Sequence, residues 1–238
     1  MSPALRVLGI VPARGGSKRL PRKNVRILRG KPLVAHSIEA AQVATRITRL
    51  VVSSDDEEVL SIARRYDPSI ALPRPAALAS DTALAIEFVR HALETLEKAG
   101  DATYDAVAIV QPSSPLTQTE DIDATIELLE TSGADSAVTV MELDHAIHPA
   151  KLKTMDGTRL LPYLEQESGR MAAHQLPRLY VRNCSVYAIR RSTIEQGEII
   201  GQDSRGYVMP RERSVDINDE LDWEFVQFLA GRAEGRRE

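Results

Sequence analysis

A short apolar run near the start of the chain leads into a glycine turn that is surrounded by positive charge. Residues 7–11 are all apolar or glycine, and the run is short enough to form a buried strand. Gly15 and Gly16 follow it, and paired glycines let the backbone turn sharply and approach a ligand closely. No Asp or Glu occurs before Glu39, whereas nine Lys or Arg do. This local field favours a polyanionic ligand, although the chain as a whole has a formal net charge of −4.

The spacing around this turn differs from that of two common phosphate-binding motifs. Neither Gly-x-x-x-x-Gly-Lys-Ser/Thr nor Gly-x-Gly-x-x-Gly is present. What remains is a strand followed by backbone amides and cations, a combination that suits phosphoryl oxygens. The cations are Arg14, Lys18, Arg19, Arg22 and Lys23. A solvated turn without a ligand is the alternative, because most charge runs in proteins are simply solvated.

Apolar runs alternate with helical patterns along the rest of the chain. The expected strands cover residues 5–11, 50–54, 69–72, 106–111, 136–141 and 185–189. The expected helices cover residues 33–44, 56–66, 81–99, 120–131 and 219–230. This alternation predicts a single α/β domain over residues 1–238, with a Rossmann-like, mostly parallel sheet and helices on both faces. Ligands of such sheets bind beyond the carboxyl ends of the strands.

Two helices have ends and faces that the sequence predicts. We expect Asp81 to cap the helix at 81–99, Gly100 to end it, and Asp219 to cap the last helix. The expected buried faces are Leu84, Phe88, His91/Ala92 and Leu96 in the first, and Leu221, Phe225, Val226 and Leu229 in the second.

Residues 142–182 interrupt the alternating pattern. Short apolar pieces are separated there by Pro149, Gly157, Pro162, Gly169 and Pro177. A long irregular insertion in a compact domain is usually functional or packs against a partner. We therefore expect this insertion to mediate homodimerisation and to border the substrate pocket.

Composition excludes several classes of protein. A sequence pI near 5.8 argues against a general nucleic-acid binder. The single cysteine, Cys184, rules out an internal disulfide and suits a reducing cytoplasm. No run of 18 apolar residues exists, so we expect no membrane span. The N-terminus is rich in Arg, but Pro12, Pro21 and the paired glycines disfavour the amphipathic helix of a transit peptide.

An acidic cluster near the C-terminus predicts a magnesium site. Four acids lie within residues 216–222, and one or two carboxylates together with phosphates and waters form typical Mg²⁺ sites. The alternative is an acidic first turn that complements the helix dipole. We expect both roles, with Asp216 for the metal and Asp219, Glu220 and Asp222 for the helix.

Three other features carry little weight alone. The segment 74–82 reads as a loop and helix cap, although Arg74 before Pro75 is extended enough to reach a ligand. His145 and His148 have no further His or Cys at ligand spacing, which disfavours a metal site. Cys184 has no neighbouring base and is expected to be a small buried residue.

Seven segments, taken together and in order, resemble the acylneuraminate cytidylyltransferase family, the CMP-sialic acid synthetases and their relatives. They are residues 10–24, 30–33, 51–55, 74–82, 111–116, 183–187 and 216–222. No single segment is decisive, but their joint occurrence over nearly the whole chain is specific. The resemblance implies that CTP and a nine-carbon 2-keto sugar acid react to give a CMP-sugar and pyrophosphate, with Mg²⁺ as the cofactor.

The resemblance also implies roles for individual residues. The triphosphate would be held by Arg14, Gly15, Ser17, Lys23 and Asn24, and nucleotide recognition would involve Arg74 and Ser80. The sugar acid would contact Gln111, Lys151, Asn183 and Tyr187, with Lys151 reaching it across a dimer interface. Asp216 and Asn218 would hold the metal. Lys23, Arg14 and Asp216 are the expected catalytic residues, and Lys23 would assist departure of the pyrophosphate.

The departures from the family pattern cluster on the sugar side. Asn218 stands where a second aspartate is usual, Cys184 where a glycine is usual, and Thr117 where an arginine is usual. The usual Arg-Arg-Gln is replaced at residues 172–175, so Arg170, Arg178 or Arg182 would take over binding of the sugar carboxylate. Legionaminic, pseudaminic and other nonulosonic acids are therefore candidate acceptors. The alternatives are an eight-carbon acid such as Kdo, and an inactive protein that binds CTP or CMP as a regulatory ligand.

Overall fold

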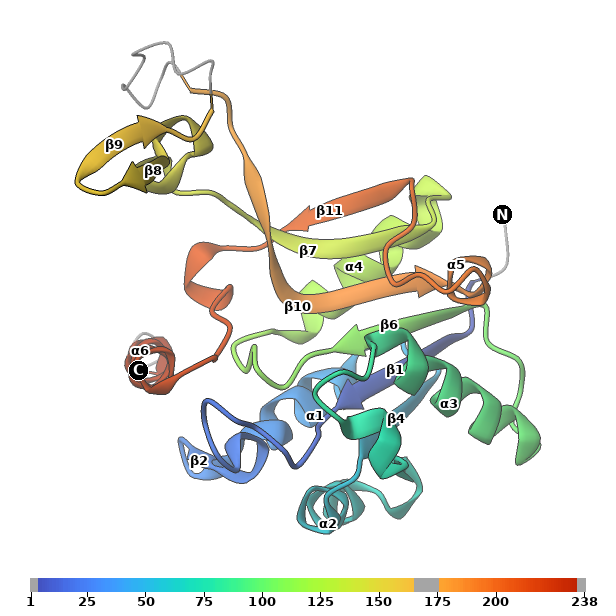
Figure 1. Ribbon diagram of the computed structural model, residues 1–238. Coiled ribbons are helices and arrows are strands. Elements are labelled where there is room, and N and C mark those ends of the chain that lie inside the picture. Colours follow the sequence, from blue (N-terminus) through green and yellow to red (C-terminus); the bar gives the residue numbers. More distant parts are fainter. Residues whose placement is uncertain (1–3, 165–175, 235–238) are drawn as a thin grey trace.

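The centre of the molecule is a seven-stranded sheet with the order β11-β7-β10-β6-β1-β4-β5 (Figure 1). The structure is a computed structural model, and it describes residues 4–164 and 176–234. The strands of this sheet are β1 (Val7–Pro12), β4 (Arg49–Ser54), β5 (Ala71–Pro73), β6 (Ala106–Val110), β7 (Ser136–Glu142), β10 (Tyr180–Arg190) and β11 (Ser204–Val208). All neighbours pair in parallel except β10, which runs antiparallel to both β6 and β7.

Helices cover both faces of the sheet, as the alternation of strands and helices predicts. One face carries α1 (Leu33–Val43), α2 (Glu57–Tyr66) and α4 (Thr119–Ser132), and the other carries α3 (Ala85–Lys98) and α5 (Arg191–Glu195). Helix α2 illustrates the local cause. Its N-cap Asp56 accepts a hydrogen bond from the amide of Glu58, and Val59, Ile62 and Ala63 are spaced to bury one face.

A smaller core holds the last helix, α6 (Glu220–Glu234), against the segment that follows the glycine turn. Trp223 and Val226 of α6 pack with Leu20, Leu28 and Leu33. This segment also carries the short strands β2 (Ile27–Leu28) and β3 (Lys31–Pro32). The packing brings the acidic C-terminal cluster beside the basic N-terminal loop, although the two are about 200 residues apart in the sequence.

The insertion is more regular than the sequence indicated. It contains an antiparallel hairpin of β8 (Lys153–Asp156) and β9 (Arg159–Pro162), which stands away from the main sheet beyond the end of β7 (Figure 1). Gly157 makes the turn with a left-handed φ of 58°. Three of the four residues of β9 and all of β8 are exposed, so the hairpin lacks the alternation of buried and exposed positions that signals a strand.

The start predicted for the helix at 81–99 was too early. Helix α3 begins at Ala85 with Leu84 in the cap position, so Asp81 is not its N-cap and Leu84 is 64% exposed rather than buried. Gly100 follows the helix with a φ of 89°, as expected. Asp219 also fulfils its prediction, because its carboxylate accepts a hydrogen bond of 3.0 Å from the amide of Asp222.

The predicted buried face of the last helix was wrong at two of its four residues. Leu221 and Phe225 are 74% and 49% exposed, whereas Trp223 and Val226 form the contact. The strand β11 was also missed, because Ser204, Arg205 and Gly206 give it little apolar signal.

Short 3₁₀ helices lie at Lys23–Val25, Pro68–Ile70, Ala76–Ala79, His145–Ile147, Pro149–Lys151 and Arg211–Arg213. Within the described residues, every helix is too short or too polar to cross a bilayer.

Candidate active site

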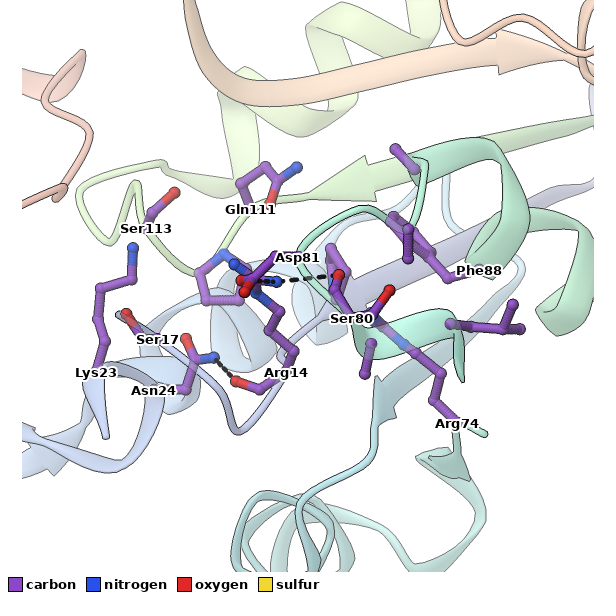
Figure 2. A pocket seen from close by; sticks show the side chains of 16 residues that line it. Arg14, Ser17, Lys23, Asn24, Arg74, Ser80, Asp81, Phe88, Gln111 and Ser113 are labelled. Carbon is purple, nitrogen blue, oxygen red and sulfur yellow. Dashed lines mark hydrogen bonds and ion pairs between the residues drawn. The ribbon is translucent and has the colours of Figure 1, made fainter. Parts of the chain in front are cut away.

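A cavity of about 330 Å³ opens beyond the carboxyl ends of β1, β5 and β6. Seven of the residues assigned from the sequence to nucleotide or sugar binding line it: Arg14, Ser17, Lys23, Asn24, Arg74, Ser80 and Gln111. Figure 2 shows their side chains arranged around one opening, with Lys23 directed toward Ser113. The position agrees with the general rule for ligands of parallel sheets.

The glycine turn is fixed by hydrogen bonds from both sides. The amide of Gly15 donates to Oδ1 of Asp55 at 3.0 Å, and Nδ2 of Asn24 donates to the carbonyl of Arg14 at 2.9 Å. A Cβ on residue 15 would lie 3.0 Å from the Asp56 side chain, which explains a glycine there. Gly16, by contrast, has no atom within 4 Å of its Cβ position, so the chain leaves space beside it.

Two cations of the turn pair with a carboxylate across the cavity mouth. Nη1 of Arg14 lies 3.1 Å from Asp81, and Nζ of Lys18 lies 2.5 Å from it. Arg14 also donates to the carbonyl of Ser80 at 3.2 Å. The hydrogen bond from Lys18 is the largest cause that holds the pKa of Asp81 below its usual value. An anionic group therefore already occupies the cations that would bind phosphate. From the sequence, Asp81 was predicted only as a helix cap.

Lys23 joins the basic turn to the acidic C-terminal cluster. Its Nζ donates to the carbonyl of Ile217 at 2.7 Å. Burial lowers the pKa of Lys23, and the nearby charge of Asp216 opposes that shift. A partly buried ammonium beside a carboxylate has a stronger field than an exposed one, because water screens it less.

Arg74 is built into the wall of the cavity. Only 7% of it is exposed, and its guanidinium donates to the hydroxyl and the carbonyl of Ser53 at 3.0 and 2.7 Å. The guanidinium also lies 4.6 Å from the ring centroid of Phe88. Burial lowers the pKa of Arg74 to about 10. Its geometry is thus set by the protein before a ligand arrives.

The acidic cluster offers some of the oxygen ligands of a metal site but does not surround the metal completely. Oδ1 of Asp216 is buried without a hydrogen-bond partner, and Oδ2 accepts from Nδ2 of Asn218 at 3.0 Å. An orphaned carboxylate oxygen fits a hard cation such as Mg²⁺. Among residues 4–164 and 176–234, no group of three or more His, Cys, Asp or Glu is arranged around one point. The fit therefore depends on further oxygens from a ligand. Asp219 and Asp222 exchange hydrogen bonds between side chain and backbone at the start of α6.

The segment that carries Asp216 is anchored by residues that the sequence did not single out. Arg213 donates two hydrogen bonds, of 3.1 and 2.6 Å, to the fully buried Asp121 of α4. The amide of Ile217 donates to the carbonyl of Ser113 at 2.8 Å. Arg213 and Asp121 are 92 positions apart, so no local pattern could have indicated their pairing.

The residues assigned to the sugar acid do not share one cavity. Asn183 lines a second cavity of about 350 Å³ together with Asp216. Tyr187 is half-buried in the core on the α3 face, where burial and a hydrogen bond with Cys184 raise its pKa. Lys151 lies in the insertion and lines neither cavity. Arg170 and the substituted segment 172–175 lie outside the described residues.

Cys184 occupies an unusual backbone conformation. Its φ is 60°, in the left-handed region, and the register of β10 against β7 shifts between Arg182 and Tyr187. Glycine adopts this conformation without steric cost, which explains why the resembled family has glycine at this position. A cysteine here keeps the bulge and adds a thiol to the wall of the second cavity.

Comparisons with known proteins extend over nearly the whole chain. A family model described as cytidylyltransferase matches residues 8–205. CMP-N,N'-diacetyllegionaminic acid synthase of Legionella pneumophila is 32% identical over 229 residues, covering 94% of this chain and 96% of that protein. Pseudaminic acid cytidylyltransferase of Campylobacter jejuni is 29% identical, covering 93% and 95%. N-acylneuraminate cytidylyltransferase of Escherichia coli is 28% identical and covers 93% of this chain, but the match spans 51% of that protein.

A solved structure shares the fold. A CMP:2-keto-3-deoxy-manno-octonic acid synthetase complexed with CTP matches with a TM-score of 0.69 and 17% sequence identity. The match covers 96% of this chain and 99% of the other. At this identity the likeness concerns the arrangement of the elements alone.

Proposed function

Because this chain belongs to the cytidylyltransferase family, we propose that it transfers CMP from CTP to the anomeric 2-hydroxyl of a nonulosonic acid and releases pyrophosphate. The relatives named for legionaminic, pseudaminic and N-acylneuraminic acids support this acceptor class. The observation that carries the proposal is the cavity beyond the strand ends, where Arg14, Lys23 and Arg74 converge.

The chemistry asks for charge stabilisation and alignment. The 2-hydroxyl of the sugar loses its proton to water and its oxygen bonds to the α-phosphorus, while the bond from that phosphorus to the bridging oxygen breaks and negative charge moves onto the departing pyrophosphate. Arg14 and Ser17 hold the triphosphate beside Asn24, on the turn that Gly15 shapes, while Arg74 and Ser80 bind the nucleoside part. Lys23, which lines the same cavity, would supply a point charge that stabilises the leaving group. Alignment of the acceptor oxygen with the leaving group supplies much of the remaining acceleration.

A magnesium ion would be held by the acidic cluster together with oxygens of the triphosphate. Asp216 would hold it through its unpartnered oxygen, and Asn218 would contribute its amide oxygen after rotation of the amide group that now faces Asp216. When bound, Mg²⁺ neutralises charge on the phosphates. Asn218 lowers the charge of the site relative to a second aspartate, so we favour one tightly held ion.

The sugar acid would lie between the two cavities, in contact with Gln111 and Asn183 and near Tyr187. Lys151 would reach it from a second copy, in a homodimer formed through the insertion. The exposed apolar side chains of the hairpin support this dimer, because Met155 is 70% and Leu160 is 62% exposed. Light scattering at micromolar concentration tests it, and a monomer mass would contradict it.

A pyrophosphate-release screen tests the function. CTP and the other nucleoside triphosphates are combined with a panel of nonulosonic acids and with Kdo. We expect release only with CTP and a nonulosonic acid. Release with Kdo alone would assign the eight-carbon acceptor instead. A rise in melting temperature with CTP, without pyrophosphate release from any acid, would identify a nucleotide-binding protein that has lost catalysis.

A further inference from the structure

The second cavity lies beside the first one, called here the nucleotide cavity because we propose that CTP binds in it. Charged groups of the two cavities act on each other. Asp216 lines the second cavity, and its charge acts on Lys23, which lines the first. The walls come from β10 and from the segment between β11 and α6. An acceptor bound here would therefore lie next to a triphosphate bound in the first cavity.

A bulge in β10 lies in the wall of this cavity. In a regular strand, neighbouring side chains point to opposite faces. Here Val181, Arg182, Asn183 and Cys184 all line the same space. Val181 and Arg182 are still in regular register with β7, whereas the shift of register after Arg182 and the left-handed Cys184 break the alternation at Asn183 and Cys184. Bulges commonly redirect side chains beside active sites.

Of the two arginines that line the cavity, one is already paired. Nη1 of Arg211 lies 2.8 Å from Asp144. Arg182 has no ion pair with any acid in the described part of the chain, residues 4–164 and 176–234. Arg178 lies outside the cavity and pairs with Glu142 at 3.9 Å. Arg182 is thus the cavity cation whose charge is available to a ligand.

An acidic acceptor needs such a cation at this place. Asp216 and Asp222 both line the cavity and would repel a carboxylate. A guanidinium offers two parallel N–H groups that match a carboxylate, and its charge offsets this repulsion. We propose that Arg182 binds the C1 carboxylate of the acceptor sugar acid and thereby selects acidic over neutral sugars. This inference rests on the proposed function and assigns one residue within it.

The experiment compares Arg182→Ala and Arg182→Lys with the wild type in steady-state assays of pyrophosphate release. Arg205→Ala is the matched control, because Arg205 is an exposed arginine on β11 that pairs with Asp203. We expect Arg182→Ala to raise the KM for the sugar acid by about 10- to 100-fold, the range for a charge-assisted bidentate pair. The KM for CTP should change less than about twofold, and Arg182→Lys should recover part of the loss, since a lysine keeps the charge but not the fork.

A second arm isolates the carboxylate itself. An acceptor analogue with a C1 carboxamide removes the charge from the substrate instead of the protein. For the wild type, replacing the acid by the analogue should weaken binding about as much as Arg182→Ala weakens binding of the acid. For Arg182→Ala, replacing the acid by the analogue should weaken binding little further. Binding of the acid without nucleotide or metal, measured by saturation-transfer NMR, gives the same comparison independently of turnover.

The outcomes separate this inference from the proposed function. If the wild type releases no pyrophosphate with any acid, the function fails. If the wild type is active but Arg182→Ala keeps its KM for the acid, the assignment of Arg182 fails alone. The assignment would also be overturned if Arg178→Ala raised the KM for the acid more than Arg182→Ala does. The same holds if Arg182→Ala lost as much affinity on changing from the acid to the carboxamide analogue as the wild type does. Should Arg182→Ala not fold, Arg182→Lys and the analogue still decide.

Discussion

The two cavities differ in how their charges are satisfied. In the nucleotide cavity Arg14 pairs with Asp81, Lys23 donates to Ile217, and Arg74 is held by Ser53. In the second cavity, the described residues provide no ion pair for Arg182, and one oxygen of Asp216 is buried without a partner.

This contrast indicates two modes of preparation for substrate. The nucleotide side is ordered by its own chain, and a triphosphate bound there as proposed would displace the Asp81 carboxylate from Arg14 and Lys18. The second cavity keeps charges whose partners arrive with the ligands. Cys184, one of the departures from the resembled family, lines this second cavity, where a change of one pairing group would redirect specificity without disturbing the rest of the site.

The largest effect is expected from Lys23→Ala on the nucleotide side. Loss of the cation beside the leaving group should lower kcat by about 10²- to 10³-fold and change the KM for CTP much less. Lys31→Ala is the control, because Lys31 pairs with Glu39 on the surface outside the cavity. Steady-state kinetics with a melting curve for each variant measures this. Turnover close to that of the wild type would remove the proposed role of Lys23.

Asp216→Asn tests the proposed metal ligand, which lines the second cavity and acts on Lys23 in the first. We expect turnover to fall by about 100-fold and the Mg²⁺ dependence to be lost, because the carboxylate with the unpartnered oxygen is removed. Asp219→Asn is the control, since Asp219 caps α6 and keeps a cap as Asn. Mn²⁺ binding followed by electron paramagnetic resonance provides a readout apart from activity. An unaltered metal titration would refute the metal assignment.

Arg213→Ala tests the anchor beneath the acidic cluster. It leaves the fully buried carboxylate of Asp121 without its cation, which should lower the free energy of unfolding by about 3 kcal/mol. Arg205→Ala breaks the half-exposed pair with Asp203 and should cost less than about 1 kcal/mol. Urea denaturation measures both values. Equal costs for the two variants would show that the buried pair does not hold this segment.

The pH dependence distinguishes Lys23 from an ordinary lysine. Burial lowers its pKa from 10.5, so in the free enzyme the ammonium loses its proton at a lower pH than an exposed lysine does. The kcat/KM for CTP should therefore fall with rising pH before an exposed lysine would titrate, by at most about tenfold per pH unit. Lys23→Arg retains its charge and should move this alkaline limb to higher pH. The same limb in both proteins would contradict the assignment.

The smallest effect is expected from Asp81→Asn at the cavity mouth. The variant removes the charge that occupies Arg14 and Lys18, so CTP should bind roughly two- to fivefold more tightly at low salt, with less difference at high salt. Asp203→Asn is a control on another exposed ion pair. Calorimetry at two salt concentrations measures it. Weaker CTP binding would show that Asp81 supports the site instead of blocking it.

Local patterns predicted the elements that have strong periodicity. The parallel core strands and the five longer helices follow from apolar spacing and from caps such as Asp219. The patterns failed where tertiary contacts decide. Leu221 and Phe225 have helical spacing with Val226, yet Trp223 is the residue that reaches Leu20 and Leu33.

The candidate site shows the same division. The glycine turn and the strand-end loops brought Arg14, Lys23, Arg74 and Gln111 to one cavity, because parallel strands end at the same edge. The pairing of Asp81 with Arg14 and of Arg213 with Asp121 joins residues 67 and 92 positions apart, respectively, and depends on the folded chain. The available charge of Arg182 became apparent only once the partners of the other arginines were known.

A crystal structure with Mg²⁺ and a CTP analogue that cannot release pyrophosphate tests the central claim most directly. The account predicts phosphate oxygens on the amides and cations of the turn from Arg14 to Lys23, with Asp81 displaced from Arg14 and Lys18. Phosphates bound elsewhere, with the Asp81 pairs intact, would contradict it.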